Sequence, residues 1–277
     1  MSLVDIEIFN KLKAVGDHSG TLDNIAEVAL LLAQMSLREN GLKRYYDELE
    51  LISLNMDQAS LGVNTLVDQI KSLHRVIYTQ HGYHGDIESY NDTQNANLMR
   101  VIDRRKGLPV ALGILVIHAA RSQGWNIAGL NFPGHFLLRL SKLGEHAIIN
   151  PFDDARLMLV DELNQLLKGV YGSNIKLSRE FIKTVSDRDI LVRLQNNIKT
   201  RALQEGDRKR AIEVLVSMNL IVPINIDILS ELALLESDQG NYQRAIKRLE
   251  LFLERNLKAL DRVRIIALKD KLKQNLN

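Results

Sequence analysis

The sequence contains no cysteine, which excludes disulfides, thiolate metal sites and cysteine nucleophiles. It also lacks a long apolar run, because stretches such as ALGILVIHAA at 111–120 are too short to cross a bilayer. The N-terminal residues show no basic region followed by an apolar one, so they do not resemble a signal peptide. We therefore expect a cytoplasmic protein that does not associate with a membrane.

The residues that are present are typical of a globular protein. Of the 277 residues, 45% are hydrophobic and 25% are charged, which is enough for a sizeable core in one large or two modest domains. The net charge of +2 is unevenly spread, since residues 185–277 carry +4 and the remainder carries −2. A basic C-terminal part can contact nucleic acid, but aromatic residues are scarce there, and a solvated helical face is the favoured interpretation.

The first part of the sequence has the apolar spacing of helices. Residues 22–36, 45–56 and 61–80 place apolar side chains three and four positions apart. The segment 81–97 is rich in Gly, Asn, Asp and Tyr, so it is predicted to be a loop. A short helix is predicted to follow the loop and to end at Gly107.

The middle of the sequence combines a buried helix with two strands. Pro109 suits the first turn of a helix at 109–123, which is apolar on almost every face and should be buried all round. Strands are predicted at 126–140, with a bend at Pro133-Gly134, and at 146–152, with the turn SKLGE between them. A further helix is predicted from the sequence that follows the second strand.

The C-terminal part contains a repeat. The stretch EGDRKRAI at 205–212 recurs as QGNYQRAI at 239–246, an offset of 34 residues. A glycine between two helices and an alanine at their close contact, with this period, resemble the tetratricopeptide repeat. Two such units and a last helix at 258–275 form a short array, which we expect to pack on the N-terminal part. The alternative is a pair of ordinary helical hairpins with a coincidental match.

The order of elements in the middle of the chain can build a nucleophilic site. A helix N-terminus stabilises a thiolate with its unpaired N–H groups. A histidine on a neighbouring strand can accept the thiol proton, and a carboxylate on the next strand can orient that histidine. Here the helix that begins at Pro109 precedes a strand with His135 and a strand that reaches Asn150.

The stretches KGLPVALGILVIHAARSQGW, GLNFPGHFLLRL and HAIINPF resemble the transglutaminase-like core, most closely that of the SirB family of bacterial transglutaminase-like proteins (its soluble member). The preceding GYHGDIESYNDTQNANLMRVIDRRKG and a tetratricopeptide tail also fit that family. The resemblance implies an α+β fold. In this fold, residues 4–180 are expected to form N-terminal helices and a papain-like helix-and-sheet core. Residues 185–277 are expected to form a tetratricopeptide-like helical region.

The resemblance argues against the family's reaction. Carried over residue by residue, the triad positions are Pro109 for the cysteine, His135 for the histidine and Asn150 for the orienting carboxylate. Asparagine can still orient an imidazole, but the nucleophile is missing and the chain has no cysteine to replace it. Ser122 lies roughly three turns along the helix from Pro109, too far from the helix N-terminus to substitute.

The loop supplies most of the other candidate residues. The residues predicted to bind a ligand or to line a pocket are Tyr83, His84, Tyr90, Asn95, Asn97 and His135. His81, His84, Asp86 and Asp92 could begin a metal site, but the spacing is short and no second pair of ligands stands out. Structural loop histidines are therefore favoured, and no metal or other cofactor is expected. His118, in the apolar helix, is predicted to be a core histidine bonded to a neighbouring carbonyl.

The leading functional hypothesis is a non-catalytic one. A degenerate transglutaminase-like domain binds a protein or peptide at the His135 cleft, the helical repeats add an interaction surface, and the protein acts as a regulatory module. The alternative is a cysteine-independent hydrolase or amide-modifying enzyme with His135 as the base, which requires His135 in an open cleft with a polar partner. Nucleic acid is the least favoured partner, and binding to it would fall steeply with salt.

Overall fold

The structure, a computed structural model, contains two compact units. The first, here called the core unit, is Gly20–Leu194, and the second, the helical unit, combines Met1–Ser19 with Gln195–Asn277. Helix α8 (Asp187–Gln204) runs across the division, whereas the sequence predicted a boundary between residues 180 and 185. The residues that the structure describes are 3–18, 20–37, 41–172, 175–254 and 258–275.

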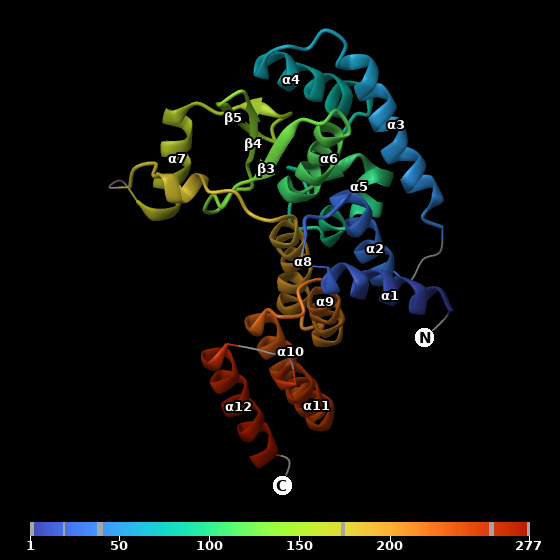
Figure 1. Cartoon of the computed structure of the whole chain (residues 1–277), viewed down its shortest axis with the longest axis vertical. Helices are drawn as coiled ribbons and strands as arrows, with labels where there is room; N and C mark the ends of the chain where they lie inside the picture. Colours follow the sequence, from blue (N-terminus) through green and yellow to red (C-terminus); the bar gives the residue numbers. More distant parts are fainter. Residues whose placement is uncertain (1–2, 19, 38–40, 173–174, 255–257, 276–277) are drawn as a thin grey trace. The chain divides into compact units, whose positions relative to one another are not determined.

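The core unit has the predicted α+β class, with helices around one central helix. Its helices are α2 (Ile25–Leu37), α3 (Lys43–Ala59), α4 (Leu66–Leu73) with a π-helix (His74–Gln80), a 3-10 turn (Thr93–Ala96), α5 (Leu98–Arg104), α6 (Pro109–Ser122), α7 (Val160–Tyr171) and a second 3-10 turn (Arg179–Ile182). Helix α6 lies between the sheet and helices α3 and α5 (Figure 1). Ten of its 14 residues are buried, which confirms the all-round burial predicted for this helix.

A four-stranded antiparallel sheet covers another side of α6. Its order is β3 (Asn126–Gly129), β4 (Leu138–Lys142), β5 (Glu145–Asn150) and β6 (Arg156–Leu157). Leu138 of β4 pairs with both Gly129 of β3 and Ile149 of β5. Apolar side chains on the inward face of β4 and β5 are buried, so the sheet contributes one wall of the core.

The prediction of one bent strand at 126–140 is wrong. Strands β3 and β4 run antiparallel, and residues 130–137 form the loop that joins them. Pro133 lacks an N–H for a strand ladder, and Gly134 has φ of +71°, a left-handed conformation that favours glycine. His135 therefore lies in a loop between two strands and not within a strand. We call residues 130–137 the His135 loop.

The short helix α5 ends earlier than predicted. It ends at Arg104, and Arg105 adopts the left-handed conformation (φ 58°) that the sequence pattern assigned to a glycine. The chain then forms β2 (Lys106–Gly107), which pairs in parallel with β1 (His84–Gly85) from the segment predicted to be a loop. This small sheet ties the segment 84–107 to the start of α6.

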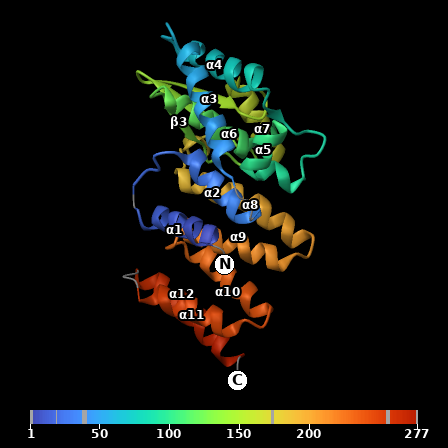
Figure 2. The same cartoon turned by 90° about the vertical axis from the view of Figure 1, so that its right-hand side faces the viewer.

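In the helical unit, helices that follow one another in sequence run antiparallel, and one helix from the N-terminus packs with them. Besides the C-terminal part of α8, its helices are α1 (Leu3–Asp17), α9 (Arg208–Ile221), α10 (Ile226–Asp238), α11 (Tyr242–Leu253) and α12 (Ala259–Gln274). Helix α1, from the N-terminal part of the chain, packs against α9 (Figure 2). Among the described residues, no helix is both long and apolar enough to pass through a bilayer.

The two copies of the sequence repeat have the same local geometry. Gly206 and Gly240 both have left-handed backbones, with φ of 79° and 78°, in the turn that separates two helices. Ala211 and Ala245, which follow at the same spacing, are both fully buried. A left-handed turn favours glycine, and a close helix contact favours a small side chain, so the matched residues meet matched physical requirements.

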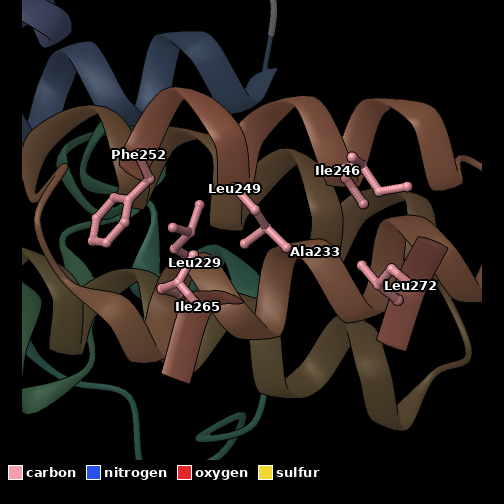
Figure 3. Packing of buried hydrophobic residues seen from close by; sticks show 8 residues of the cluster. Leu229, Ala233, Ile246, Leu249, Phe252, Ile265 and Leu272 are labelled. Carbon is pink, nitrogen blue, oxygen red and sulfur yellow. The ribbon is translucent and has the colours of Figure 1, made fainter. Parts of the chain in front are cut away.

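A compact apolar cluster holds α10, α11 and α12 together (Figure 3). Its buried residues are Leu229, Ala233, Ala245, Ile246, Leu249, Phe252, Ile265 and Leu272. Ala233 and Ala245 allow α10 and α11 to approach closely, and Ile265 and Leu272 contribute the face of α12 that covers them. The cluster gives these three helices a core of their own.

Candidate functional site

The His135 loop is fixed to its surroundings through its backbone. Leu130 N–H donates to Leu137 O at 3.0 Å, which closes the loop. Arg193 of α8 donates from Nη2 to the carbonyl of His135 at 2.8 Å. These bonds fix the two ends of the loop to each other and the carbonyl of His135 to α8.

The imidazole of His135 is half-buried and sits against an aromatic ring. It lies edge-on to Phe132, with 6.4 Å between ring centroids, and within the described residues it makes no hydrogen bond. Burial, and then the positive charge of Arg193, lower the pKa of His135 below its usual value. The imidazole is therefore neutral at neutral pH, and the contacts of the described residues include no group that orients it as a general base requires.

The His135 loop is attached to the first half of α6. The ring of Phe136 packs on Gly113, where an added Cβ would overlap the ring. Gly113 lies four positions after Pro109, so both are on one face of the helix. The structure thus places Phe136, the residue next to His135, on the same face of α6 as Pro109. Pro109 is the first residue of α6 and offers neither an N–H nor a reactive group.

Asn150 serves a local turn. Its Oδ1 accepts a hydrogen bond from the N–H of Phe152 at 3.0 Å, at the end of β5. Phe152 in turn meets Tyr90 edge-to-face, with 5.7 Å between centroids. Asn150 therefore stabilises the chain reversal that presents Phe152, and the described contacts do not join it to the imidazole of His135.

Arg193 is one of the residues near His135 that the sequence analysis missed, as are Phe152 and Val170. Its guanidinium carbon lies 5.4 Å from the centroid of Phe136, a cation–π contact. Burial lowers its pKa, and the nearby Tyr90 opposes this effect. The sequence signal was an arginine between the buried residues Ile190 and Leu194 on one face of α8, but nothing in the sequence connected it to His135.

Partly exposed apolar side chains lie near His135 and Arg193. Tyr90 is 45% exposed and Val170, at the end of α7, is 46% exposed. Val170 lies against Gly134, where an added Cβ would come within 2.8 Å of it. We call His135, Arg193, Tyr90, Phe152 and Val170 the His135 site.

Two further predicted residues hold the loop that carries Tyr90. Asn95 is buried, its amide donates to Ser89 O at 2.7 Å, and its Oδ1 accepts from Arg104 at 2.9 Å. The carbonyl of Asn95 also accepts from the N–H of Leu108, directly before α6. Asn97 caps α5, because its Oδ1 accepts from a backbone N–H of the first turn. Both asparagines position the loop and the start of α6.

Tyr83 belongs to a buried polar network away from the His135 site. Its hydroxyl donates to Glu48 Oε1 at 3.0 Å, and Arg105 pairs with both oxygens of Glu48. His81 Nδ1 lies 2.7 Å from the same carboxylate, and Asn55 contacts His81 Nε2 at 2.9 Å. Burial raises the pKa of Glu48, but hydrogen bonds from Arg105 and His81 outweigh it and lower the value to about 2. The network joins α3 to the small sheet.

The other histidines have structural surroundings. His84 is exposed, and its Nδ1 lies 3.1 Å from Gly82 O. Asp86 is buried against Arg104, with 2.9 Å between the charged groups. No cluster of three or more His, Cys, Asp or Glu side chains suited to a metal ion occurs in the described ranges. His118 contacts the carbonyl of Leu49 at 2.9 Å, which confirms the prediction of a core histidine.

Comparisons with known proteins cover this whole region. A family model described as the transglutaminase-like superfamily matches residues 39–196. A UPF0162 protein of Vibrio cholerae is 30% identical over 182 residues, which is 65% of this chain and 67% of the relative. A UPF0162 protein of Haemophilus influenzae is 28% identical over 187 residues, or 68% and 70% of the two chains. A crystal structure of menin aligns with a TM-score of 0.41 and 10% identity over 98% of this chain and 75% of menin, a likeness too low to support a conclusion.

Proposed function

Because this chain belongs to the transglutaminase-like superfamily and yet contains no cysteine, we propose that it is a non-catalytic member that binds a protein or peptide in a regulatory role. Within the superfamily we assign it to the SirB family, on the motifs around Pro109, His135 and Asn150.

The observation that carries the proposal is the position of Pro109. The helix start that holds the nucleophile in active members is here occupied by a residue without any reactive group. His135 keeps its place in the sequence, but Asn150 is engaged with Phe152 and the described contacts give the imidazole no orienting partner. What the site retains is a half-buried histidine, an arginine and exposed apolar side chains, a combination suited to recognition.

We propose that the helical unit supplies a second binding surface and that its helices are tetratricopeptide-like. The support is the equivalent geometry of Gly206 and Gly240 and of Ala211 and Ala245. Stacked helix pairs of this kind expose extended faces that bind peptides or proteins. Leu234 and Leu251 of this unit are examples of large apolar side chains left partly exposed.

An activity assay separates this proposal from an enzymatic one. The full chain is incubated with a glutamine-containing protein and a fluorescent primary amine, and in parallel with amide and ester substrates. We expect neither amine incorporation nor hydrolysis above that of a heat-denatured sample. Turnover by the wild type that disappears in a folded His135→Ala variant would establish the cysteine-independent hydrolase or amide-modifying enzyme instead.

A binding assay tests the positive part of the proposal. A random peptide display library is selected against the immobilised full chain. We expect enriched peptides that bind both the wild type and His135→Ala with similar affinity, because a neutral imidazole without an orienting partner contributes little to recognition. A library that yields no enriched peptide at any round contradicts the binding function.

A further inference from the structure

We propose that a pocket between α3 and α4 binds a phosphate group through Lys71 and Arg75. The pocket has a volume of about 270 Å³ and lies in the core unit, where α3 ends and α4 begins. We call it the α3–α4 pocket. None of its residues belongs to the His135 site, so the proposal goes beyond the binding of a protein or peptide. The residues that line it are Ala59, Leu61, Gly62, Val63, Asp68, Lys71, Ser72 and Arg75.

Hydrogen bonds fix the shape of the α3–α4 pocket. The hydroxyl of Ser72 donates to the carbonyl of Ala59 at 2.9 Å, which ties α4 to the last residue of α3. Thr65 caps α4, because its Oγ1 accepts from the N–H of Asp68 at 3.1 Å and donates to the carboxylate of Asp68 at 2.7 Å. Walls that are already in place lose little conformational freedom when a ligand binds.

Two cationic side chains line the pocket from one helical segment. Lys71 and Arg75 are four positions apart, the spacing at which side chains on a helix are neighbours. Both are exposed, and within the described part of the chain neither forms a hydrogen bond or an ion pair. Like charges at this spacing destabilise a helix. An anion bound between them would remove that repulsion.

Asp68, the acidic residue of the lining, does not neutralise both cations. The hydrogen bond from Thr65 is the main cause that lowers the pKa of Asp68, and Lys71 adds a smaller electrostatic contribution. The carboxylate is therefore ionised at neutral pH and already has a partner. The lining thus carries two positive charges against one negative charge, and this excess favours an anionic ligand.

The combination of an arginine with a lysine favours phosphate over carboxylate. A guanidinium takes two oxygens of an anion in a planar fork, and an ammonium group takes a further oxygen as a point charge. A phosphate monoester offers three terminal oxygens, whereas a carboxylate offers two. The volume is below the roughly 300–1,000 Å³ of pockets that enclose drug-sized ligands. The group attached to the phosphate is therefore small, and Ala59, Leu61 and Val63 offer it an apolar wall.

The helical segment changes its winding between the two cations. Helix α4 ends at Leu73 and continues as the π-helix His74–Gln80, which contains Arg75. Tyr78 anchors this π-helix in the core, because its buried hydroxyl donates to the carbonyl of Pro151 at 2.8 Å. π-Helical turns are rare and occur frequently at functional sites. Here the wider turn sets the direction from which Arg75 reaches the pocket.

Isothermal titration calorimetry of the full chain with glycerol 3-phosphate tests the proposal. We expect binding in the millimolar range or tighter, and binding of glycerate, a carboxylate of similar size, that is weaker by about tenfold. Lys71→Gln and Arg75→Gln should each weaken binding of glycerol 3-phosphate by about tenfold, since each removes a charged hydrogen bond. Arg75→Lys keeps the charge and should lose less. Lys176→Gln removes an exposed cation outside the pocket and should bind as the wild type does.

A second assay identifies the source of the phosphate, because soluble metabolites and lipid headgroups both carry it. Sedimentation with phosphatidylcholine vesicles is compared with and without phosphatidic acid. Sedimentation that requires phosphatidic acid and falls in both glutamine variants, without binding of glycerol 3-phosphate, would support a lipid headgroup. Binding of glycerol 3-phosphate that falls in the same variants supports a soluble ligand.

Three results would overturn the proposal. They are equal binding of glycerate and glycerol 3-phosphate, binding that neither Lys71→Gln nor Arg75→Gln weakens, and the absence of binding in both assays. Both replaced side chains are exposed, so the variants are expected to fold, and circular dichroism checks this. The outcome does not depend on the peptide library, so this proposal and the proposed binding function succeed or fail separately.

Discussion

At the scale of single residues, two networks of ionisable groups in this protein have different surroundings. Glu48, His81 and Arg105 satisfy one another in a buried structural group that joins α3 to the small sheet. His135 and Arg193 are joined through one backbone carbonyl, and Arg193 also lies against the ring of Phe136. The first network joins α3 to the small sheet, and the second fixes the His135 loop to α8.

Replacing Glu48 tests the structural network. Its folded pKa of about 2 is below its ordinary value of 4.5, so its contribution to stability is present above pH 4.5 and is lost as the pH falls towards 2. We expect Glu48→Gln to lower the free energy of unfolding by about 3 kcal/mol at pH 7 and to flatten its decline in acid. Urea denaturation between pH 7 and pH 3 measures both effects. Glu50→Gln, an exposed change on the same helix, should leave the curve unchanged. Equal stability of Glu48→Gln and the wild type at pH 7 would show that the network does not stabilise the fold.

Particular residues show which parts of the site could be predicted from the sequence. Pro109, His135 and Asn150 were found because they follow a motif in the sequence order. Arg193 and Glu48 were not, because Arg193 meets His135 across 58 residues and Glu48 meets Arg105 across 57. A contact of this kind depends on how helices pack, and a single sequence has no local pattern that reports it.

At the scale of elements, a small residue on the central helix sets the position of the His135 loop. Gly113 of α6 receives the ring of Phe136, and Gly129 of β3 lies against the same ring from the sheet. The ring is thus enclosed between a helix and a strand and covered by Arg193. The loop geometry therefore depends on α6 having no side chain at this position.

Gly113→Ala tests this packing. In a helix the change normally gains about 1 kcal/mol, but here the new Cβ overlaps a ring that cannot move aside. We expect a net loss of about 1–2 kcal/mol in the free energy of unfolding. Gly169→Ala in α7, where an added Cβ meets open space, is the matched control and should be neutral or slightly stabilising. A stabilised Gly113→Ala variant in thermal or urea unfolding would show that the ring is not confined.

The cluster between α10, α11 and α12 makes a second prediction at this scale. Leu249 is fully buried in it (Figure 3). Leu251, two positions later on α11, is 53% exposed. Leu249→Ala should cost about 2–5 kcal/mol through lost contacts and a cavity. Leu251→Ala should change stability by less than about 0.5 kcal/mol. Chemical denaturation followed by circular dichroism compares the two, and similar losses would contradict the assigned faces of α11.

The sequence predicted the type of most elements but not every boundary. The helix expected from residue 61 begins at Leu66, since Gly62 and the cap of Thr65 delay it. The strand expected at 126–140 is a hairpin because Pro133 and Gly134 interrupt the ladder. Periodicity identifies the face of an element, whereas its ends depend on single residues whose backbone conformation the pattern does not specify.

At the scale of the whole molecule, one of the two compact units is formed by segments that are separated in sequence. The N-terminal helix α1 belongs to the same compact unit as α8 to α12, although the core unit lies between them in sequence. Gly16 of α1 lies so close to the carbonyl of Leu220 in α9 that an added Cβ would overlap it. The helical unit therefore includes helix α1, a segment that the sequence analysis grouped with residues 4–180.

Gly16→Ala tests the attachment of α1. The overlap is with a backbone carbonyl, which cannot rotate away, so we expect α1 to separate from α9 and the helical unit to lose about 2 kcal/mol. Hydrogen exchange measured by mass spectrometry should rise in α1 and α9 and stay unchanged in α6. Lys13→Ala, an exposed change on the same helix, serves as the control. Unchanged protection of α9 in Gly16→Ala would disprove the close approach.

The pairing of α1 with α9 has a consequence for synthesis on the ribosome. Helix α1 ends at Asp17 and α9 begins at Arg208. At about 5–20 residues per second, the first helix is translated on the order of 10–40 s before its partner emerges. During that time Ile8 and Leu12, which are buried in the finished protein, have no surface to cover them. Helix α1 thus leaves the ribosome well before the surface on which it packs, and its apolar face is open to chaperones until α9 has emerged.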